Sequence, residues 1–426
     1  MKRLPTFMAI LFLLTVCSFA GDVHRIIISG VINPVSAEYI MESIEDAEEA
    51  GAVLLIIEMD TPGGLMNSMH DIVKKILSSE IPVAVYIAPS GSRAGSAGVF
   101  ITMAAHIAVM APGTNIGSAH PVTIAGQQDT SKVMMEKIIN DAVASIRSVT
   151  EKRGRNADWA EKAVRESANI TASEALEKNV IDYIAPNIDS LLVMIDGMEI
   201  DVLSGKKILA TSGSKIVNFE MNWRQKVLDI LSDPNIAYIL FLLGLSGLGL
   251  ELYNPGAILP GVVGGICLIL FLFAMQTIPI NFAGVLLIIF AAVLFLLEIK
   301  VTSYGILSIG GVIALILGSI MLVDSPLPFL QISWKVIAAA TICFTLFFIL
   351  AIGLAIRAHR RQPATGKEGL VGEEGVVLKE LNPTGMVEVH GEIWKAEAPE
   401  RIRKKERIVV EAVDAKHLRL KVKQIN

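Results

Sequence analysis

Between residues 24 and 185, short runs of apolar residues alternate with segments in which apolar residues recur every three or four positions. A short continuous apolar run is typical of a buried strand, whereas the longer period is typical of an amphipathic helix. Strands and helices in alternation predict an α/β domain with a layered fold. Strands are predicted at 26–28, 53–59, 83–87 and 107–110, and helices at 37–50, 67–77 and 134–152.

The pattern changes after residue 230, where apolar runs follow one another with few charged positions between them. A helix needs about 20 apolar residues to cross the hydrocarbon core of a bilayer, and each run approaches or reaches that length. The first run is the shortest and is rich in glycine, so we expect it either to pair with a neighbouring helix or to lie at an angle. The runs occupy residues 236–252, 257–276, 281–298, 304–323 and 335–356.

An internal repeat supports this count of five spans. The segment 251–256, followed by the pair Gly264-Gly265, resembles the segment 298–305, followed by Gly310-Gly311. Two similar helical hairpins and one final helix give five crossings. Basic residues directly after the last run then place the C-terminus inside the cell by the positive-inside rule, and the first domain outside. These residues are Arg357, His359, Arg360 and Arg361.

The two ends of the chain differ from the middle. Residues 1–20 combine a basic start, an apolar run and small residues before Gly21, which predicts a secretory signal peptide, with an uncleaved anchor as the alternative. Residues 367–426 contain several short strand patterns separated by turns, which predict a small all-β module, a five-stranded barrel of the OB type. Strands are expected there at 386–389, 408–413 and 418–422. The predicted domains are therefore 1–20, 21–230, 235–357 and 367–426.

Composition agrees with a membrane protein that carries folded parts outside the bilayer. Of 426 residues, 53% are hydrophobic and only 19% are charged, which excludes a disordered chain and a purely cytosolic enzyme. The net charge of −5 gives no general attraction to nucleic acid. The basic run 401–407 has acidic residues interleaved, so we interpret it as a solvated loop.

Nothing in the sequence predicts a metal or cofactor. All three cysteines, Cys17, Cys267 and Cys343, lie inside apolar runs, so they predict neither a disulfide framework nor a zinc site. There is also no phosphate-binding Walker motif.

Two motifs in the first domain favour nucleophilic chemistry. Gly63 and Gly64 directly follow a predicted strand, where backbone N–H groups can approach a ligand and form an oxyanion hole; a plain turn is the alternative. Ser96 lies among small residues at the expected start of a helix, where developing negative charge is favoured. Ser90 and Ser92 are rival nucleophiles, and helix capping is the alternative role for all three serines.

A serine nucleophile needs a base, and two residues are candidates. Lys137 lies near the start of the helix predicted at 134–152 among apolar neighbours, and burial makes a lysine a usable base. Asp141, one turn later, would instead hold the lysine charged. His120 is the competing base, because a Ser–His pair performs the same chemistry. Spacing alone does not decide between them.

Taken together, the motifs resemble the long form of the NfeD family. They are Asp60-Thr-Pro-Gly-Gly64, Ala94-Gly-Ser-Ala-Gly98, Met110-Ala-Pro-Gly-Thr-Asn-Ile-Gly117, Gly154-Arg-Asn-Ala157 and Ser173-Glu-Ala-Leu176, with Gly391 and Trp394 in the C-terminal module. The resemblance covers nearly the whole chain. It implies an α/β exported domain of the ClpP/crotonase type, a multi-span helical membrane domain and an OB-type C-terminal domain.

The resemblance also implies a site and a role. Ser96 and Lys137 would form a Ser–Lys dyad, with Gly63 and Gly64 as oxyanion donors; Lys132 is a second lysine nearby, and His120 is the alternative base. The implied activity is a serine endopeptidase that cleaves apolar segments of membrane-associated proteins, with a stomatin-like (SPFH/band 7) protein as substrate or partner. A homo-oligomer, a dimer or larger, is implied as well.

Two other functions are compatible with the same sequence. One is a non-catalytic scaffold that organises stomatin-like membrane assemblies. The other is the digestion of signal peptides by a relative of signal peptide peptidase A. Ser96, Lys137 and the glycine pair together favour an enzyme, since a scaffold does not need all of them.

Overall fold

The computed structural model describes residues 21–122, 132–253, 256, 258–275, 278–301, 303, 305–323, 325, 330–359, 367–414 and 418–425. The predicted signal peptide at 1–20 lies outside this range. The described residues divide into two compact units, one within 1–296 and 305–341 and the other within 297–304 and 342–426.

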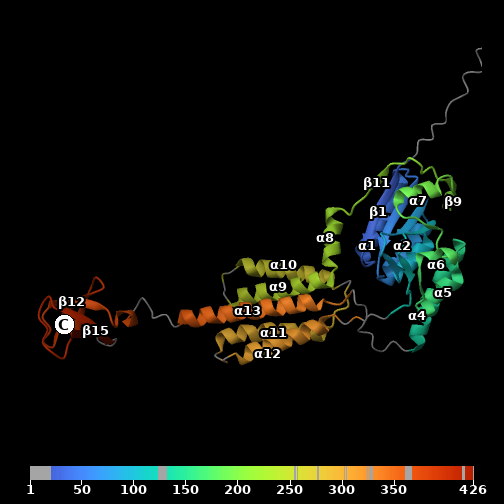
Figure 1. The fold of residues 1–426 in the computed structure, drawn as a ribbon. Helices are drawn as coiled ribbons and strands as arrows, with labels where there is room; N and C mark the ends of the chain where they lie inside the picture. The colour runs from blue at the N-terminus through green and yellow to red at the C-terminus, as the bar shows by residue number, and fades with distance from the viewer. Residues whose placement is uncertain are drawn as a thin grey trace, which may run out of the picture. The chain divides into compact units, whose positions relative to one another are not determined.

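The first unit begins with an α/β domain built on a six-stranded parallel sheet (Figure 1). Strands β2 (Leu54–Asp60) and β3 (Val83–Ile87) are apolar and buried along almost their whole length, as expected for a parallel sheet covered on both faces. The alternation of strands and helices predicted from the sequence is thus confirmed. In spatial order the strands are β11 (Ile216–Asn218), β1 (Val23–Ser29), β2 (Leu54–Asp60), β3 (Val83–Ile87), β5 (Ile107–Met110) and β8 (Tyr183–Ile184).

Helices cover both faces of this sheet because alternate strand residues point to opposite sides. Ile57 and Val85 face a large core shared with the first helices, while Ile56 and Ala84 face a smaller core with α7. The helices of the larger face are α1 (Pro34–Glu49), α2 (Met66–Leu77), α3 (Ala97–Ala104), α4 (Lys132–Lys152), α5 (Ala157–Arg165) and α6 (Ala172–Glu177). The smaller face carries α7 (Ile188–Ile195) and the hairpin of β9 (Glu199–Val202) and β10 (Gly205–Ile208).

A buried arginine caps the C-terminal end of α3 by donating hydrogen bonds to its carbonyl groups. The guanidinium of Arg155 donates hydrogen bonds to the carbonyl oxygens of Met103 (3.1 Å) and Ala105 (2.9 Å). It also pairs with the carboxylate of Asp182 at 2.6 Å, and its side chain is only 2% exposed. These bonds satisfy carbonyls that a helix leaves unpaired at its end, and they fix α3 against the sheet.

Next to this network, His106 makes the stability of the domain sensitive to acid. Its Nδ1 accepts a hydrogen bond from the Val83 N–H at 3.2 Å, so the folded state holds a neutral ring. Burial first, and then the charges of Arg153, Arg155 and Lys152, lower the pKa of His106 to about 3. The unfolded chain takes up this proton below about pH 6.5, whereas the folded chain does so only near pH 3.

We therefore expect the free energy of unfolding to fall by about 1.4 kcal/mol per pH unit from this group as the pH drops from 6.5 towards 3. The thermal midpoint should fall with it. Thermal unfolding of wild type and His106→Asn, compared between pH 7 and 5, isolates the contribution of the histidine from that of the carboxylates. The variant should show a flatter profile in this window. Equal slopes for both proteins would contradict the assignment.

The five predicted apolar segments coincide with five helices. By length and composition, α9 (Pro234–Tyr253) is the one helix among the described residues long and apolar enough to cross a membrane. Four apolar helical stretches of 10–17 described residues follow it, at Ile258–Ala274, Phe282–Glu298, Ile306–Leu322 and Trp334–Phe347. The first pair packs tightly: a Cβ atom added to Gly247 would lie 2.8 Å from the Cα atom of Gly264 on α10, which confirms the expected close pairing of the glycine-rich helix. Helices α9 and α10 lie side by side, as do α11 and α12 (Figure 1). The later helices are α10 (Ile258–Ala274), α11 (Phe282–Lys300), α12 (Ile306–Leu322) and α13 (Trp334–His359).

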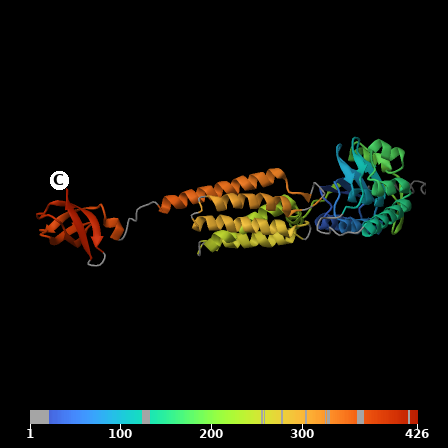
Figure 2. The same cartoon turned by 90° about the horizontal axis from the view of Figure 1, so that it is seen from below.

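The second unit contains a closed five-stranded barrel, which confirms the predicted OB-type module (Figure 2). Its interior is filled by aliphatic side chains such as Val377, Val387 and Leu420. In the basic run, Arg401 pairs with Glu380, in agreement with a solvated loop. In barrel order the strands are β12 (Glu374–Lys379), β13 (Thr384–Val389), β14 (Glu392–Glu397), β16 (Arg419–Gln424) and β15 (Arg407–Asp414).

Candidate active site

The site begins where the segment after β2 runs beside the short strand β4 (Arg93–Gly95). Thr61 N–H donates to the Arg93 carbonyl at 2.8 Å, and Gly95 N–H donates to the Thr61 carbonyl at 2.9 Å. The Asp60 carboxylate accepts from the Arg93 N–H at 3.0 Å. These bonds hold the glycines that follow Thr61 directly against the start of α3.

Ser96 occupies the N-cap position of α3 in a strained backbone conformation. Its φ of 48° and ψ of −108° lie in a region that residues with a Cβ atom rarely adopt. The side chain makes no capping hydrogen bond. Helix capping therefore does not account for this serine.

The rival serines are placed differently. Ser92 is buried, with 3% of its surface exposed, and Ser90 lies on the surface. Of these three serines, Ser96 alone lines the pocket described below.

Gly63 approaches Ser96, and Gly64 approaches Ile32, more closely than any other residue type could. Gly63 has a φ of +128°, and a Cβ atom added to it would lie 2.7 Å from the Ser96 Cβ. A Cβ atom on Gly64 would lie 2.0 Å from the carbonyl oxygen of Ile32. The Gly63 N–H donates to the Thr61 hydroxyl at 3.1 Å, whereas the Gly64 N–H has no protein partner in the described part of the chain.

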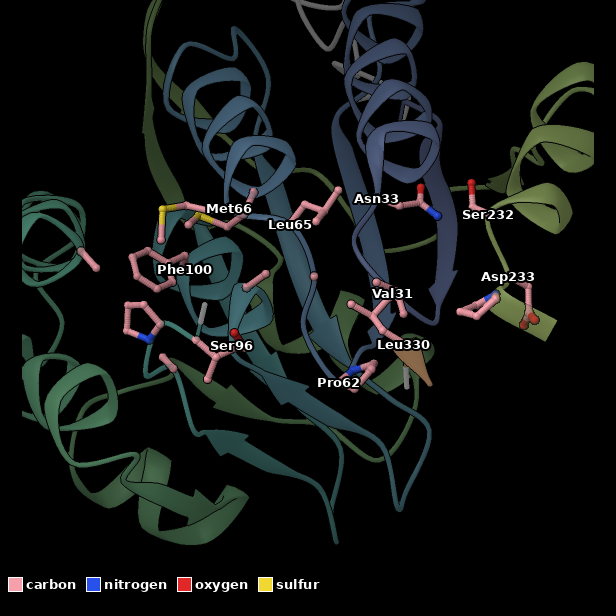
Figure 3. Close-up of a pocket in the computed structure, with 18 residues that line it drawn as sticks. Val31, Asn33, Pro62, Leu65, Met66, Ser96, Phe100, Ser232, Asp233 and Leu330 are labelled. Atoms are coloured by element: carbon pink, nitrogen blue, oxygen red, sulfur yellow. The ribbon is translucent and has the colours of Figure 1, made fainter. Parts of the chain in front are cut away.

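A pocket of about 210 Å³ opens beside Ser96 (Figure 3). In the figure, Ser96, Phe100 and Met66 lie at one end and Asn33 and Asp233 at the other. The lining is mainly apolar, so burial of an apolar side chain is the interaction that it offers. The lining residues are Val31, Asn33, Pro62, Gly64, Leu65, Met66, Met69, Ser96, Ala97, Phe100, Ala119, Pro121, Val122, Ala142, Ser232, Asp233, Pro234 and Leu330.

Lys137 is exposed, so the predicted burial of this lysine is wrong for the single chain. The fully buried residues of α4 begin at Ala142, which lines the pocket; before it, Ile139 still packs against the core while partly exposed. Lys137 precedes Ala142 by five residues, about 7.5 Å along the axis and about 140° around it. Val133 and Met134, in the same part of α4, are 63% and 51% exposed. The apolar neighbours noted in the sequence therefore surround Lys137 without covering it.

His120 is turned towards α5. Its Nδ1 lies 2.8 Å from the Val164 carbonyl oxygen; since a carbonyl only accepts, Nδ1 carries the hydrogen. Its neighbours Ala119 and Pro121 line the pocket, but His120 does not. Neither His120 nor Lys137 is hydrogen-bonded to Ser96 in the described residues.

Some contributors to the site were not found from the sequence. Phe100 and Met69 line the pocket, yet from the sequence each is indistinguishable from an ordinary helix residue that faces the core. Phe100 follows Ser96 by four residues, one helical turn, and that spacing was a usable signal. Among the described residues, no group of three His, Cys, Asp or Glu side chains is placed to hold a metal ion.

Three family models match successive parts of the chain. The model described as the NfeD1b N-terminal domain matches residues 22–191. The NfeD integral membrane domain matches residues 235–353. The NfeD-like C-terminal, partner-binding domain matches residues 367–423.

Individual proteins match over long stretches as well. The chain is 34% identical to the membrane-bound protease PH1510 of Pyrococcus horikoshii, over 97% of this chain and 96% of that protein. It is 27% identical to the membrane protein NfeD1b of Bacillus subtilis, over 84% of this chain and 82% of the relative. A solved structure of the 1510-N membrane-bound stomatin-specific protease, a lysine-to-alanine mutant with a substrate peptide, is 31% identical, with a TM-score of 0.46, and covers 49% of this chain and 97% of that one.

Proposed function

Because this chain belongs to the NfeD family, which includes the membrane-bound protease of P. horikoshii, we propose that it is a membrane-anchored serine endopeptidase. The observation that carries the proposal is the setting of Ser96. It lies at one end of an apolar pocket that Gly64 also lines, on a strained turn, and against Gly63, which no larger residue could replace. Strain of this kind is costly and is found mainly where function requires it.

In the proposed reaction, Ser96 Oγ attacks the carbonyl carbon of a peptide bond after a base removes its proton. Gly64 N–H is available to the oxyanion, and Ala97 N–H belongs to the first turn of α3, whose N–H groups have no partner within the helix. For Gly63 N–H to donate to the oxyanion, it would have to give up its hydrogen bond to the Thr61 hydroxyl. The base then protonates the leaving amine, and water releases the acyl group from the serine.

We assign the base to Lys137, on the implication of the family resemblance; on α4 it precedes by five residues Ala142, which lines the pocket. In the single chain the Lys137 side chain is exposed to water, and a general base must be neutral. The exposed apolar residues Val133 and Met134 beside it support a site completed by a second copy of the chain, at least a dimer. Covering this part of α4 would remove Lys137 from water and favour the neutral amine.

The substrate we propose is an apolar segment of a membrane-associated protein. The pocket is lined by side chains such as Leu65, Met66 and Phe100, which favour apolar residues over charged ones. The related structure is that of a stomatin-specific protease, so a stomatin-like (SPFH/band 7) membrane protein is the proposed substrate or partner. We place the α/β domain outside the cell and the barrel inside, from the basic residues after the last span.

A non-catalytic scaffold is the second candidate, since the C-terminal domain matches a partner-binding model. A scaffold would use the barrel to hold the stomatin-like protein and would not depend on Ser96. Cleavage assays therefore separate the two functions.

The base assignment predicts a clear order among three variants of the full-length protein. Lys137→Ala should lower kcat/KM for an apolar peptide by about 10²–10⁴-fold, the usual contribution of a general base. Lys137→Arg should be equally impaired, because a guanidinium does not give up its proton. His120→Ala should stay within a few-fold of wild type. Activity that survives Lys137→Ala and disappears with His120→Ala would transfer the role of base to the histidine.

A further inference from the structure

Helix α8 (Trp223–Leu231), which joins the α/β domain to the first apolar helix, presents its polar side to the protein. Gln225 is 4% exposed, and its side-chain amide donates to Glu42 on α1 at 2.8 Å. The carboxylate of Asp229, one turn later, accepts from Asn33 at 3.2 Å. Hydrogen bonds thus fix the polar side of α8 against the start and middle of α1.

The opposite side of α8 is apolar and exposed. Trp223, Val227 and Ile230 are 80%, 47% and 57% exposed. Spaced by four and three residues, they fall within an arc of roughly 60° at 100° per residue. A helix on the surface of a water-soluble domain has the reverse orientation, with its apolar stripe towards the core.

We propose that α8 lies in the interface of the membrane, with Trp223, Val227 and Ile230 inserted at the boundary between headgroups and acyl chains. Interfacial helices of this kind bury their apolar face about 5–10 Å into that boundary. Because α8 is hydrogen-bonded to α1, this insertion would hold the α/β domain at the membrane surface, in addition to its covalent connection to α9. The proposal concerns lipid contact and does not depend on catalysis.

Continuity with the membrane domain identifies lipid as the partner. Helix α9, which the family model places in the integral membrane domain from residue 235, begins at Pro234, three residues after the end of α8. The exposed stripe therefore ends at Ile230, four residues before the first residue of the helix that belongs to the membrane domain. Tryptophan is the residue that favours this depth, since its ring is apolar and its N–H remains hydrated.

The charges around the stripe agree with this placement. Arg224 is exposed next to the tryptophan, and Lys226 is exposed and paired with Glu220 at 2.7 Å. Basic side chains beside an apolar stripe reach lipid headgroups while their aliphatic stems remain among apolar atoms. Both cations lie at the borders of the stripe and not at its centre.

Tryptophan fluorescence of the full-length protein in lipid nanodiscs tests the proposal, because the chain has only four tryptophans. A variant with Trp159→Phe, Trp334→Phe and Trp394→Phe keeps Trp223 alone. Its emission should be quenched by lipids brominated on the acyl chain and protected from aqueous acrylamide. Matched single-tryptophan proteins that retain Trp334, at the start of α13, or Trp394, in the barrel, serve as the lipid-exposed and lipid-remote controls.

Two outcomes would overturn the proposal. Quenching of Trp223 by acrylamide but not by brominated lipid would place α8 in water. Protection from both quenchers would mean that another protein surface, such as a second copy of the chain, covers the stripe.

A second measurement tests the same proposal without the triple variant, so it does not depend on the folding of that variant. In a protein with its native cysteines replaced by alanine, a spin label at Val227→Cys should be more accessible to oxygen than to a soluble nickel complex. A label at Lys162→Cys, exposed on α5, should show the opposite preference. A label at Val227→Cys that is more accessible to the nickel complex than to oxygen would refute membrane insertion of α8.

Discussion

Replacing Ser96 with alanine is expected to abolish peptide cleavage while leaving the fold unchanged. Loss of the nucleophile in a serine protease lowers kcat by about 10⁶-fold, since the remaining site has no group that forms the acyl intermediate. The Ser96 side chain makes no capping bond, so its removal leaves α3 with the same hydrogen bonds. Stability should therefore remain within about 0.5 kcal/mol of wild type.

The measurement is cleavage of a panel of apolar peptides by full-length protein in detergent or nanodiscs, with thermal unfolding recorded for each variant. Ser90→Ala and Ser92→Ala are the matched controls, because both serines precede Ser96 on the same segment and neither lines the pocket. Both controls should retain activity. An active Ser96→Ala protein, or an inactive Ser90→Ala protein that is folded, would move the nucleophile elsewhere.

Replacing Arg155 with alanine should produce the largest loss of stability in the α/β domain. The variant leaves the carbonyls at the end of α3 and the Asp182 carboxylate without their buried partner. Removal of one member of a buried ion pair costs about 3–5 kcal/mol. For a domain of this size the thermal midpoint should fall by roughly 6–20 °C.

Two variants calibrate this result. Arg165→Ala removes an arginine that is 42% exposed and pairs with Glu161 four residues earlier, so its cost should stay below about 1 kcal/mol. Arg155→Lys keeps the charge but not the planar fork of donors, and an intermediate loss is expected. Equal thermal midpoints for Arg155→Ala and Arg165→Ala would show that the buried network does not support α3.

The sequence was sufficient for the parts of the fold that depend on local pattern. Strands 83–87 and 107–110 were predicted to the residue, because each is a continuous apolar run with a clear boundary. The approach of Gly63 to Ser96 was also accessible, since paired glycines after a strand and a serine among small residues both indicate close backbone contact.

The features that were not predicted from the sequence depend on contacts between segments far apart in the chain. The exposure of Lys137 follows from where α4 leaves the core at Ala142, and the amphipathic pattern of the helix does not mark that point. In the sequence, Arg155 belongs to the motif beginning at Gly154, which was used only as part of the family resemblance. Its structural role depends on the fold, which brings the end of α3 and the start of β8 next to its guanidinium. The inverted orientation of α8 is likewise visible only once Gln225 and Asp229 are seen to face α1.

The central claim, that Ser96 is an activated nucleophile, is tested most directly by covalent labelling. Full-length wild type, Lys137→Ala and Ser96→Ala proteins would be treated with a fluorophosphonate and digested, and the modified residue identified by mass spectrometry. We predict an adduct on Ser96 in wild type, little labelling in Lys137→Ala and none in Ser96→Ala. An adduct on Ser90 or Ser92, or labelling of Ser96 that is unchanged in Lys137→Ala, would contradict the account.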